Sequence, residues 1–142
     1  MHKKGPIVII DDDQDDREII GEILQGLNCP NEVVILNDGQ SALDYLSGEK
    51  VNPFLIISDI NMPKMTGYQL REEIMSDEVL RRKCVPFIFF TTSGDDATIS
   101  RAYECSAQGF FHKLNDYVRF GETLDNIITY WRNADTPAFP AP

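Results

Sequence analysis

The sequence has no long hydrophobic run. Its first apolar stretch, Ile7 to Ile10, is too short for the core of a signal peptide and is followed at once by acidic residues. No other stretch approaches the roughly 20 apolar residues that a membrane-spanning helix needs. We therefore expect no membrane segment and a cytoplasmic location.

Positive charge is also scarce in this chain. Its 142 residues include 13 Lys and Arg against 23 Asp and Glu, which gives a formal net charge of -10. Nucleic-acid phosphates reward clustered Lys and Arg, so this balance argues against a nucleic-acid partner and suits cations or basic surfaces. The length is typical of one domain whose core needs neither disulfides nor metals.

Cysteine is limited to three widely spaced residues, Cys29, Cys84 and Cys105. They form no CxxC pair and have no neighbouring histidine, so neither a disulfide framework nor a zinc site is indicated. They are typical of small core or near-surface residues in a cytosolic protein.

Five short apolar runs predict buried strands that alternate with helical patterns. The runs are Ile7–Ile10, Val33–Leu36, Phe54–Ser58, Pro86–Phe90 and Gly109–His112. Because connections between parallel strands are right-handed, this alternation predicts an α/β fold in which a parallel sheet lies between two helical layers. We expect one domain over residues 6–132 and a disordered Pro/Ala tail over residues 133–142.

Five helices are expected between and after these strands. The third should follow Gly67 and continue towards Leu80, with Arg71 on its polar face. The last should place one stripe of residues inward, namely Tyr117, Phe120, Leu124, Ile127 and Trp131.

Acidic residues follow two of the predicted strands. Asp11 and Asp12 come directly after the first strand, and Asp59 follows the third, before a turn that contains Pro63. Taken alone, such acids often only cap helices or turns. In a parallel sheet, however, the carboxyl ends of strands meet at one edge, which is where open α/β folds place their ligands.

Three carboxylates at one edge imply a bound cation. At roughly 4 Å each pair would repel by about 4 kcal/mol at an effective dielectric constant near 20. Mg²⁺ suits Asp12 and Asp59 with a nearby backbone carbonyl, because it prefers oxygen ligands and commonly binds through one or two carboxylates and a phosphate oxygen. Thr91 and Lys113 end the fourth and fifth strands, so they should join this edge. A metal, an ammonium and a hydroxyl around a carboxylate suit phosphoryl transfer to aspartate.

These residues resemble the receiver domain of two-component response regulators, in particular the single-domain chemotaxis type. The resemblance spans residues 6–131 and rests on the Ile-Ile-Asp-Asp run ending at Asp12, the Asp59-Ile-Asn-Met-Pro63 run with Gly67, and on Thr91 and Lys113. It implies a doubly wound (βα)5 flavodoxin-like fold with strand order 2-1-3-4-5.

The resemblance also implies a role for each residue of the motif. Asp59 would accept a phosphoryl group from a histidine kinase or phosphotransfer protein, and Thr91 and Lys113 would contact that group. Asp11, Asp12, Asp59 and the carbonyl of Asn61 would organise Mg²⁺. Thr91 and the strand-five aromatic Phe110 would move together on phosphorylation and reshape the face made by the fourth helix, fifth strand and last helix of this pattern.

One position departs from the family pattern. Receivers usually have a cis proline directly after the strand-five lysine, whereas Leu114 follows Lys113 here. A cis bond without proline costs about 3 kcal/mol, so we expect either a trans bond with a shifted loop or a strained site.

The output of such a domain should be docking, because few residues follow Trp131. We expect a downstream protein target or a homodimer through a face that includes Tyr103, Val118 and Tyr130. Two alternatives remain open. One is a phosphohydrolase with an Asp nucleophile, for which Asp11 and Asp13 have the Asp-x-Asp spacing, and the other is an interaction module that works without phosphorylation.

Overall fold

The computed structural model describes residues 2–92 and 94–137 and contains one five-stranded sheet. All neighbouring strands are parallel, in the order β2-β1-β3-β4-β5, as expected. The strands are β1 (Ile7–Ile10), β2 (Val33–Leu36), β3 (Leu55–Ser58), β4 (Phe87–Thr91) and β5 (Gly109–His112). The three inner strands are buried along their whole length, which explains why their sequences are continuous apolar runs.

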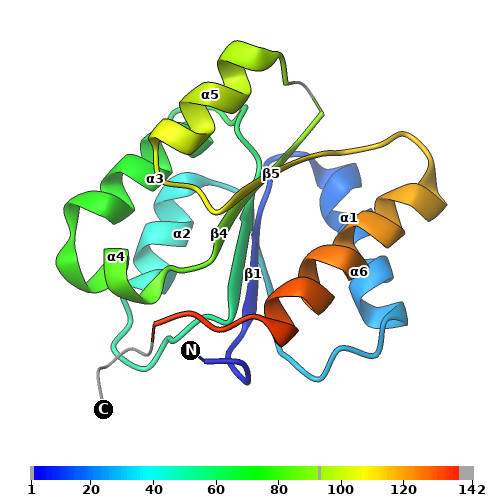
Figure 1. Cartoon of the computed structure of the whole chain (residues 1–142), viewed down its shortest axis with the longest axis horizontal. Helices are drawn as coiled ribbons and strands as arrows, with labels where there is room; N and C mark the ends of the chain where they lie inside the picture. Colours follow the sequence, from blue (N-terminus) through cyan, green and yellow to red (C-terminus); the bar gives the residue numbers. More distant parts are fainter. Residues whose placement is uncertain (1, 93, 138–142) are drawn as a thin grey trace.

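Helices cover both faces of the sheet (Figure 1). In the described residues they are α1 (Gln14–Gly26), α2 (Gly39–Leu46), α3 (Gly67–Ser76), α4 (Glu78–Lys83), α5 (Asp96–Glu104) and α6 (Tyr117–Asn133). Helices α1 and α6 lie on one face, and α2, α3, α4 and α5 lie on the other. Each face has its own apolar core, so the predicted three-layer α/β architecture is confirmed. No helix in the described part of the chain has the length and apolarity to cross a bilayer.

The third expected helix is in fact two helices, so the prediction of five helices was wrong for the described chain. Asp77 has an extended backbone, with φ -108° and ψ 121°, and ends α3. Its side chain accepts a hydrogen bond from the backbone N–H of Leu80 and so caps the start of α4. Leu80 is buried as expected, but from the second helix.

The inward stripe of α6 also differs from the prediction. Tyr117 is 54% exposed, whereas Phe120, Leu124 and Ile127 are buried together with Ile128. Tyr117 is the first residue of the helix and lines surface hollows instead of the core. The expected tail from residue 133 stays a prediction, because α6 still includes residue 133 and residues 138–142 lie outside the described part.

Arg71 is buried, which contradicts its predicted place on a polar face. It is 1% exposed, and its guanidinium donates hydrogen bonds to the carbonyl oxygens of Cys84, Cys105 and Ser106. It also lies over the ring of Phe87, 5.0 Å from the centroid. Burial lowers the pKa of this guanidinium, and the carbonyl oxygens offset its desolvation. Arg71 therefore fastens the ends of α4 and α5 to α3.

We expect the variant Arg71→Met to lose about 3 kcal/mol of unfolding free energy, because it leaves three carbonyl oxygens without this donor. Urea unfolding at 25 °C measures the change. The control is Arg81→Met on the exposed side of α4, which should change the free energy by less than about 0.5 kcal/mol. Equal losses in the two variants would contradict this role of Arg71.

Candidate functional site

The carboxyl ends of β1 and β3 bring two aspartates together. Ile10 pairs with Ser58 in the parallel register, and the backbone N–H of Asp59 donates to the carbonyl oxygen of Ile10 at 2.8 Å. Asp11 is held on its other side, where its N–H donates to the carbonyl oxygen of Leu36. Both residues thus follow directly on buried strands, and the backbone fixes their positions.

The loop after Asp59 is shaped by close backbone contacts. The side chain of Asp59 accepts a hydrogen bond from the N–H of Ile60 at 2.7 Å, and the N–H of Gly67 donates to the carbonyl oxygen of Ile60 at 2.8 Å. A Cβ atom at residue 67 would collide with the carbonyl oxygen of Asp59. Glycine is needed at this position because the backbone segments approach so closely. A left-handed turn is not the reason, since Gly67 has no positive φ. The residue with a positive φ in this loop is Lys64, at 67°.

Asp11, Asp12 and Asp59 form an acidic cluster that can hold a metal ion. Each offers a carboxylate oxygen, and the three oxygens lie within 4.8 Å of one another. Asp11 and Asp59 are 2% and 9% exposed, whereas Asp12 faces solvent. An all-oxygen set that is open on one side fits a hard divalent cation which keeps some of its waters. Asn61 lies in the following loop, and its carbonyl stays a predicted ligand.

Lys113 supplies the positive charge at this site. Its ammonium group lies 3.1 Å from Oδ2 of Asp59 and 2.9 Å from Oδ2 of Asp16, and it also donates to Oδ2 of Asp11. The Lys113 side chain is only 3% exposed. Although burial opposes the charge, hydrogen bonds and attraction to these carboxylates raise the pKa of Lys113, so it stays protonated.

Leu114, which replaces the proline usual in the family, does not move the ammonium of Lys113 away from Asp59. The cis peptide bond in the described residues is Val85–Pro86, so the bond between Lys113 and Leu114 is trans. The expected trans bond is confirmed, and the shifted loop that was expected with it stays a prediction. Leu114 is 41% exposed, while the ammonium of Lys113 still points into the acidic cluster.

Thr91 ends β4 beside the lysine. Its carbonyl oxygen accepts from the N–H of Lys113 at 2.7 Å, and the residue is fully buried. Within the described residues, its hydroxyl is the buried side-chain polar atom that lacks a hydrogen-bond partner. A buried hydroxyl without a partner is costly, so this atom is consistent with a ligand that binds there.

Phe110 is half-buried on β5, next to the loop that follows Thr91. A Cβ atom at Gly94 would come within 2.7 Å of the end of the Phe110 ring, so that ring packs directly against the loop. The ring also meets His112 edge to face, with 5.4 Å between the centroids. Phe110 therefore touches the loop after Thr91, but its predicted movement is a dynamic property and stays a prediction.

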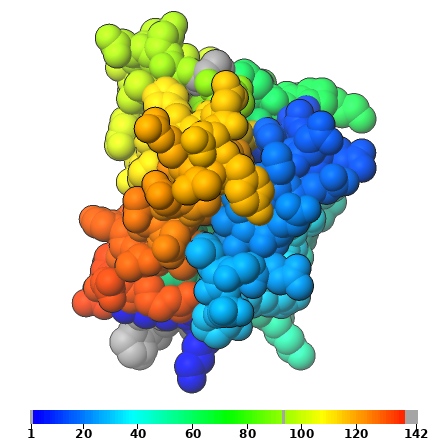
Figure 2. Space-filling view, turned by 90° about the vertical axis from the view of Figure 1, so that its right-hand side faces the viewer, coloured from blue at the N-terminus to red at the C-terminus, as the bar shows by residue number. Residues whose placement is uncertain are grey.

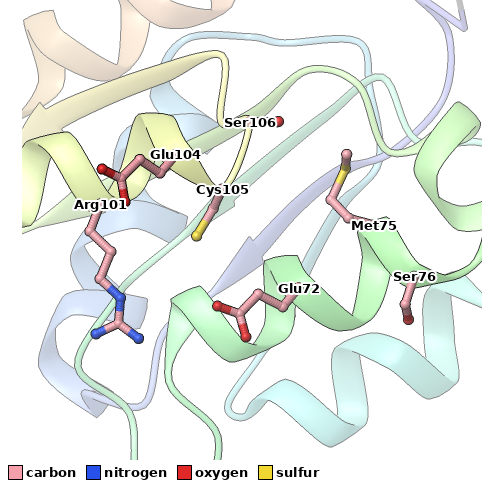
Figure 3. Close-up of a pocket in the computed structure, with 7 residues that line it drawn as sticks. All are labelled: Glu72, Met75, Ser76, Arg101, Glu104, Cys105 and Ser106. Carbon is pink, nitrogen blue, oxygen red and sulfur yellow. The ribbon is translucent and has the colours of Figure 1, made fainter.

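A surface hollow of about 470 Å³ between α3 and α5 lies apart from the acidic cluster (Figure 3). Its lining residues are Glu72, Met75, Ser76, Arg101, Glu104, Cys105 and Ser106, none of which was predicted for the site. In Figure 3, Glu72 and Met75 lie on the α3 side of the hollow, and Arg101 and Cys105 lie on its other side. Burial raises the pKa of Cys105, with Glu72 adding to the effect, so its thiol is a poor nucleophile.

The sequence-predicted residues Asp11, Asp12, Asp59 and Lys113 thus come together, with Thr91 beside the lysine. Sequence reasoning missed Asp16, which lies in the first turn of α1. Its partner Lys113 is 97 residues away along the chain, so the local sequence carries no signal for this contact.

Comparisons with known proteins agree with this geometry. Residues 7–125 match the family described as response regulator receiver domain. The response regulator Rcp1 from Synechocystis sp. is 28% identical over 140 residues, covering 95% of this chain and 92% of the relative. The crystal structure of the phosphorylated cyanobacterial phytochrome response regulator RcpA is 29% identical, with a TM-score of 0.82 over 93% of this chain and 96% of that one. The Mn²⁺-bound form of Rcp1 is 27% identical, with a TM-score of 0.81 over 94% and 99%.

The pKa of Asp11 predicts a pH dependence for cation binding. Burial raises this pKa to about 6, although Lys113 opposes the rise. A proton then competes with the cation below that value, so we expect the affinity for Mg²⁺ to fall up to about tenfold per pH unit as the pH drops below 6. Calorimetric titration at pH 5, 6, 7 and 8 measures this. An affinity that is constant from pH 5 to 8 would contradict the prediction.

Proposed function

Because the chain belongs to the response regulator receiver domain family, we propose that Asp59 is the residue that accepts the phosphoryl group. The observation that carries this assignment is the contact of 3.1 Å between the Asp59 carboxylate and the ammonium of Lys113, which lies inside an acidic cluster. Receivers are phosphoacceptor signalling domains of two-component systems rather than classical enzymes, and their phosphodonor is a histidine kinase. A phosphotransfer protein is the second candidate donor.

Asp59 would attack the phosphorus atom with a carboxylate oxygen. An O–P bond forms to Asp59 while the P–N bond of the phosphohistidine breaks, and the released imidazole nitrogen takes a proton from water. Lys113 already lies on the Asp59 side chain, where its charge would stabilise the phosphoryl oxygens. The unpartnered hydroxyl of Thr91 would donate to the same group.

We propose Mg²⁺ as the cation of this site. Asp11, Asp12 and Asp59 supply the hard oxygen ligands, and the carbonyl oxygen of Asn61 is the proposed fourth. When bound, the ion would neutralise negative charge on the phosphoryl oxygens. The relative Rcp1 has been crystallised with Mn²⁺, which is also a divalent cation.

The phosphohydrolase alternative fits the site less well. Asp13, the second acid of its Asp-x-Asp spacing, is exposed and caps α1 by accepting from the N–H of Asp16 at 2.9 Å. The acids that converge are Asp11, Asp12 and Asp59 instead. The presence of all these groups with Lys113 also speaks against a module that works without phosphorylation.

We propose the face of α5, β5 and α6 as the output surface. A groove of about 340 Å³ there is lined by residues that include Tyr103, Phe110, Tyr130 and Trp131. Tyr103 and Tyr130 are 54% and 64% exposed. Phe110 touches both this groove and the loop after Thr91, so a change at the phosphoryl site would reach the groove. A second copy of this chain is the proposed occupant, with a downstream protein target as the rival.

Val118 does not belong to that groove, contrary to expectation. It is 65% exposed and lines a separate hollow between α1 and α6, together with Tyr117. Of the three residues expected on the output surface, Tyr103 and Tyr130 line the groove and Val118 does not. We further propose that residues 6–132 act as a receiver domain in the cytoplasm, a location that the three free cysteine thiols favour.

Acetyl phosphate with Mg²⁺ should add one phosphoryl group to the wild-type chain, because Asp59 has a cation site and an ammonium group beside it. Intact-mass spectrometry detects the product. Asp59→Asn should gain no mass, and Asp44→Asn, on the exposed side of α2, should react like the wild type. Absence of a gain in the wild type, or an equal gain in Asp59→Asn, would refute the assignment.

Beryllofluoride, a phosphoryl mimic, should shift the chain towards a dimer in sedimentation velocity runs, since it acts at the site that contacts the groove through Phe110. Replacing the exposed residue Tyr130 in the variant Tyr130→Glu should prevent the shift, because it would place a charge inside the interface. A monomer at high concentration, with and without the mimic, would rule out the homodimer.

A further inference from the structure

The ammonium of Lys113 has three N–H groups, and three carboxylates accept from them. Two of these, Asp11 and Asp59, belong to the acidic cluster of the site. The third is Asp16 on α1, with its Oδ2 atom 2.9 Å from Nζ of Lys113. Asp16 is not a member of the cluster whose oxygens can share a cation. Its contact with the lysine therefore has no explanation in the metal site.

From this contact we propose that Asp16 is a positioning residue for phosphorylation, which holds the Lys113 ammonium in place for the phosphoryl group. The inference rests on the proposed role of Asp59 as acceptor. Asp11 and Asp59 would help to hold a bound cation, and phosphorylation would convert the Asp59 carboxylate into an acyl phosphate. Asp16 is the carboxylate of the three that neither event engages.

The surroundings of Lys113 give this contact its importance. The residue after it is Leu114, so no proline ring restrains the backbone at this point. A hollow of about 160 Å³ lies beside the lysine, lined by residues that include Asp16, Thr92 and Leu114. Packing is thus incomplete on this side, and the ion pair to Asp16 restrains the side chain in its place. Figure 2 shows the segment after β5, in yellow and orange, lying against the blue start of α1.

Asp16 is itself held firmly by α1. Its backbone N–H donates to the side chain of Asp13, which caps the helix, and its side chain is 24% exposed. Arg17, the next residue, donates to the carbonyl oxygen of Asp11 at 2.9 Å. The first turn of α1 therefore contacts both the backbone of the acidic cluster and its lysine. A carboxylate in that turn is also favoured by the helix dipole.

Asp15 provides a matched control. It lies in the same helical turn and carries the same charge, but it is exposed, and the ion pairs of Lys113 in the described residues do not include it. Asp15→Asn and Asp16→Asn remove equal charge from the same helix end. A difference between the two variants then reports on the contact with Lys113.

The test is the rate of phosphorylation by acetyl phosphate at saturating Mg²⁺, followed by intact-mass spectrometry. We expect Asp16→Asn to lower the rate constant about tenfold, since it weakens one charge-assisted hydrogen bond that orients the lysine. Asp15→Asn should stay within about twofold of the wild type. Thermal unfolding of each variant by circular dichroism should show a folded protein, because Asn keeps the shape of the side chain.

A second comparison separates positioning of the lysine from a purely structural role. In the Lys113→Met background, Asp16→Asn should cause no further loss of rate, because the ammonium group through which Asp16 acts is gone. A tenfold loss that persists in that background would overturn the inference, and so would a rate for Asp16→Asn within twofold of the wild type. A wild-type chain that gains no phosphoryl group would instead refute the proposed role of Asp59.

Discussion

The site depends on one buried ammonium group surrounded by carboxylates. Lys113 lies among Asp11, Asp16 and Asp59 with its side chain almost fully enclosed. One positive charge cannot balance this many negative charges, so the site retains an excess of negative charge that attracts a divalent cation. Burial raises the pKa of Asp11, with the charge of Asp59 adding to the rise, and the surrounding carboxylates raise the pKa of Lys113. The unphosphorylated site is thus arranged to bind a divalent cation together with the water molecules that the cation keeps.

The sheet makes this arrangement possible. Parallel strands end at the same edge, and the backbone hydrogen bonds between β1, β3, β4 and β5 fix where each strand ends. The N–H of Lys113 donates to the carbonyl oxygen of Thr91, so the pairing of β4 and β5 continues into the site itself. Away from this edge, Arg71 holds the ends of α4 and α5 through backbone carbonyls. The helices α3, α4 and α5 on that face are therefore joined to one another at defined points.

Much of the fold and site could be predicted from the sequence, because buried strands give continuous apolar runs and the acids follow them directly. The break at Asp77 could not, since a helical pattern continues through it and only the capping side chain shows that a new helix begins. Arg71 was misassigned because charge usually indicates solvent, and the carbonyl oxygens that accept from it come from distant segments. The partner of Asp16 is 97 residues away, so no local pattern reveals their contact.

The distance along the chain between the members of the site has a consequence for its synthesis. Lys113 and Asp11 are separated by 102 residues, and the lysine follows the last strand of the sheet. A growing polypeptide on the ribosome contains all three acids of the cluster long before it contains the lysine. Since contacts of such long range form only once the intervening chain is in place, a partly made chain has no complete acceptor site. Competence to receive a signal is therefore acquired only when the sheet is finished.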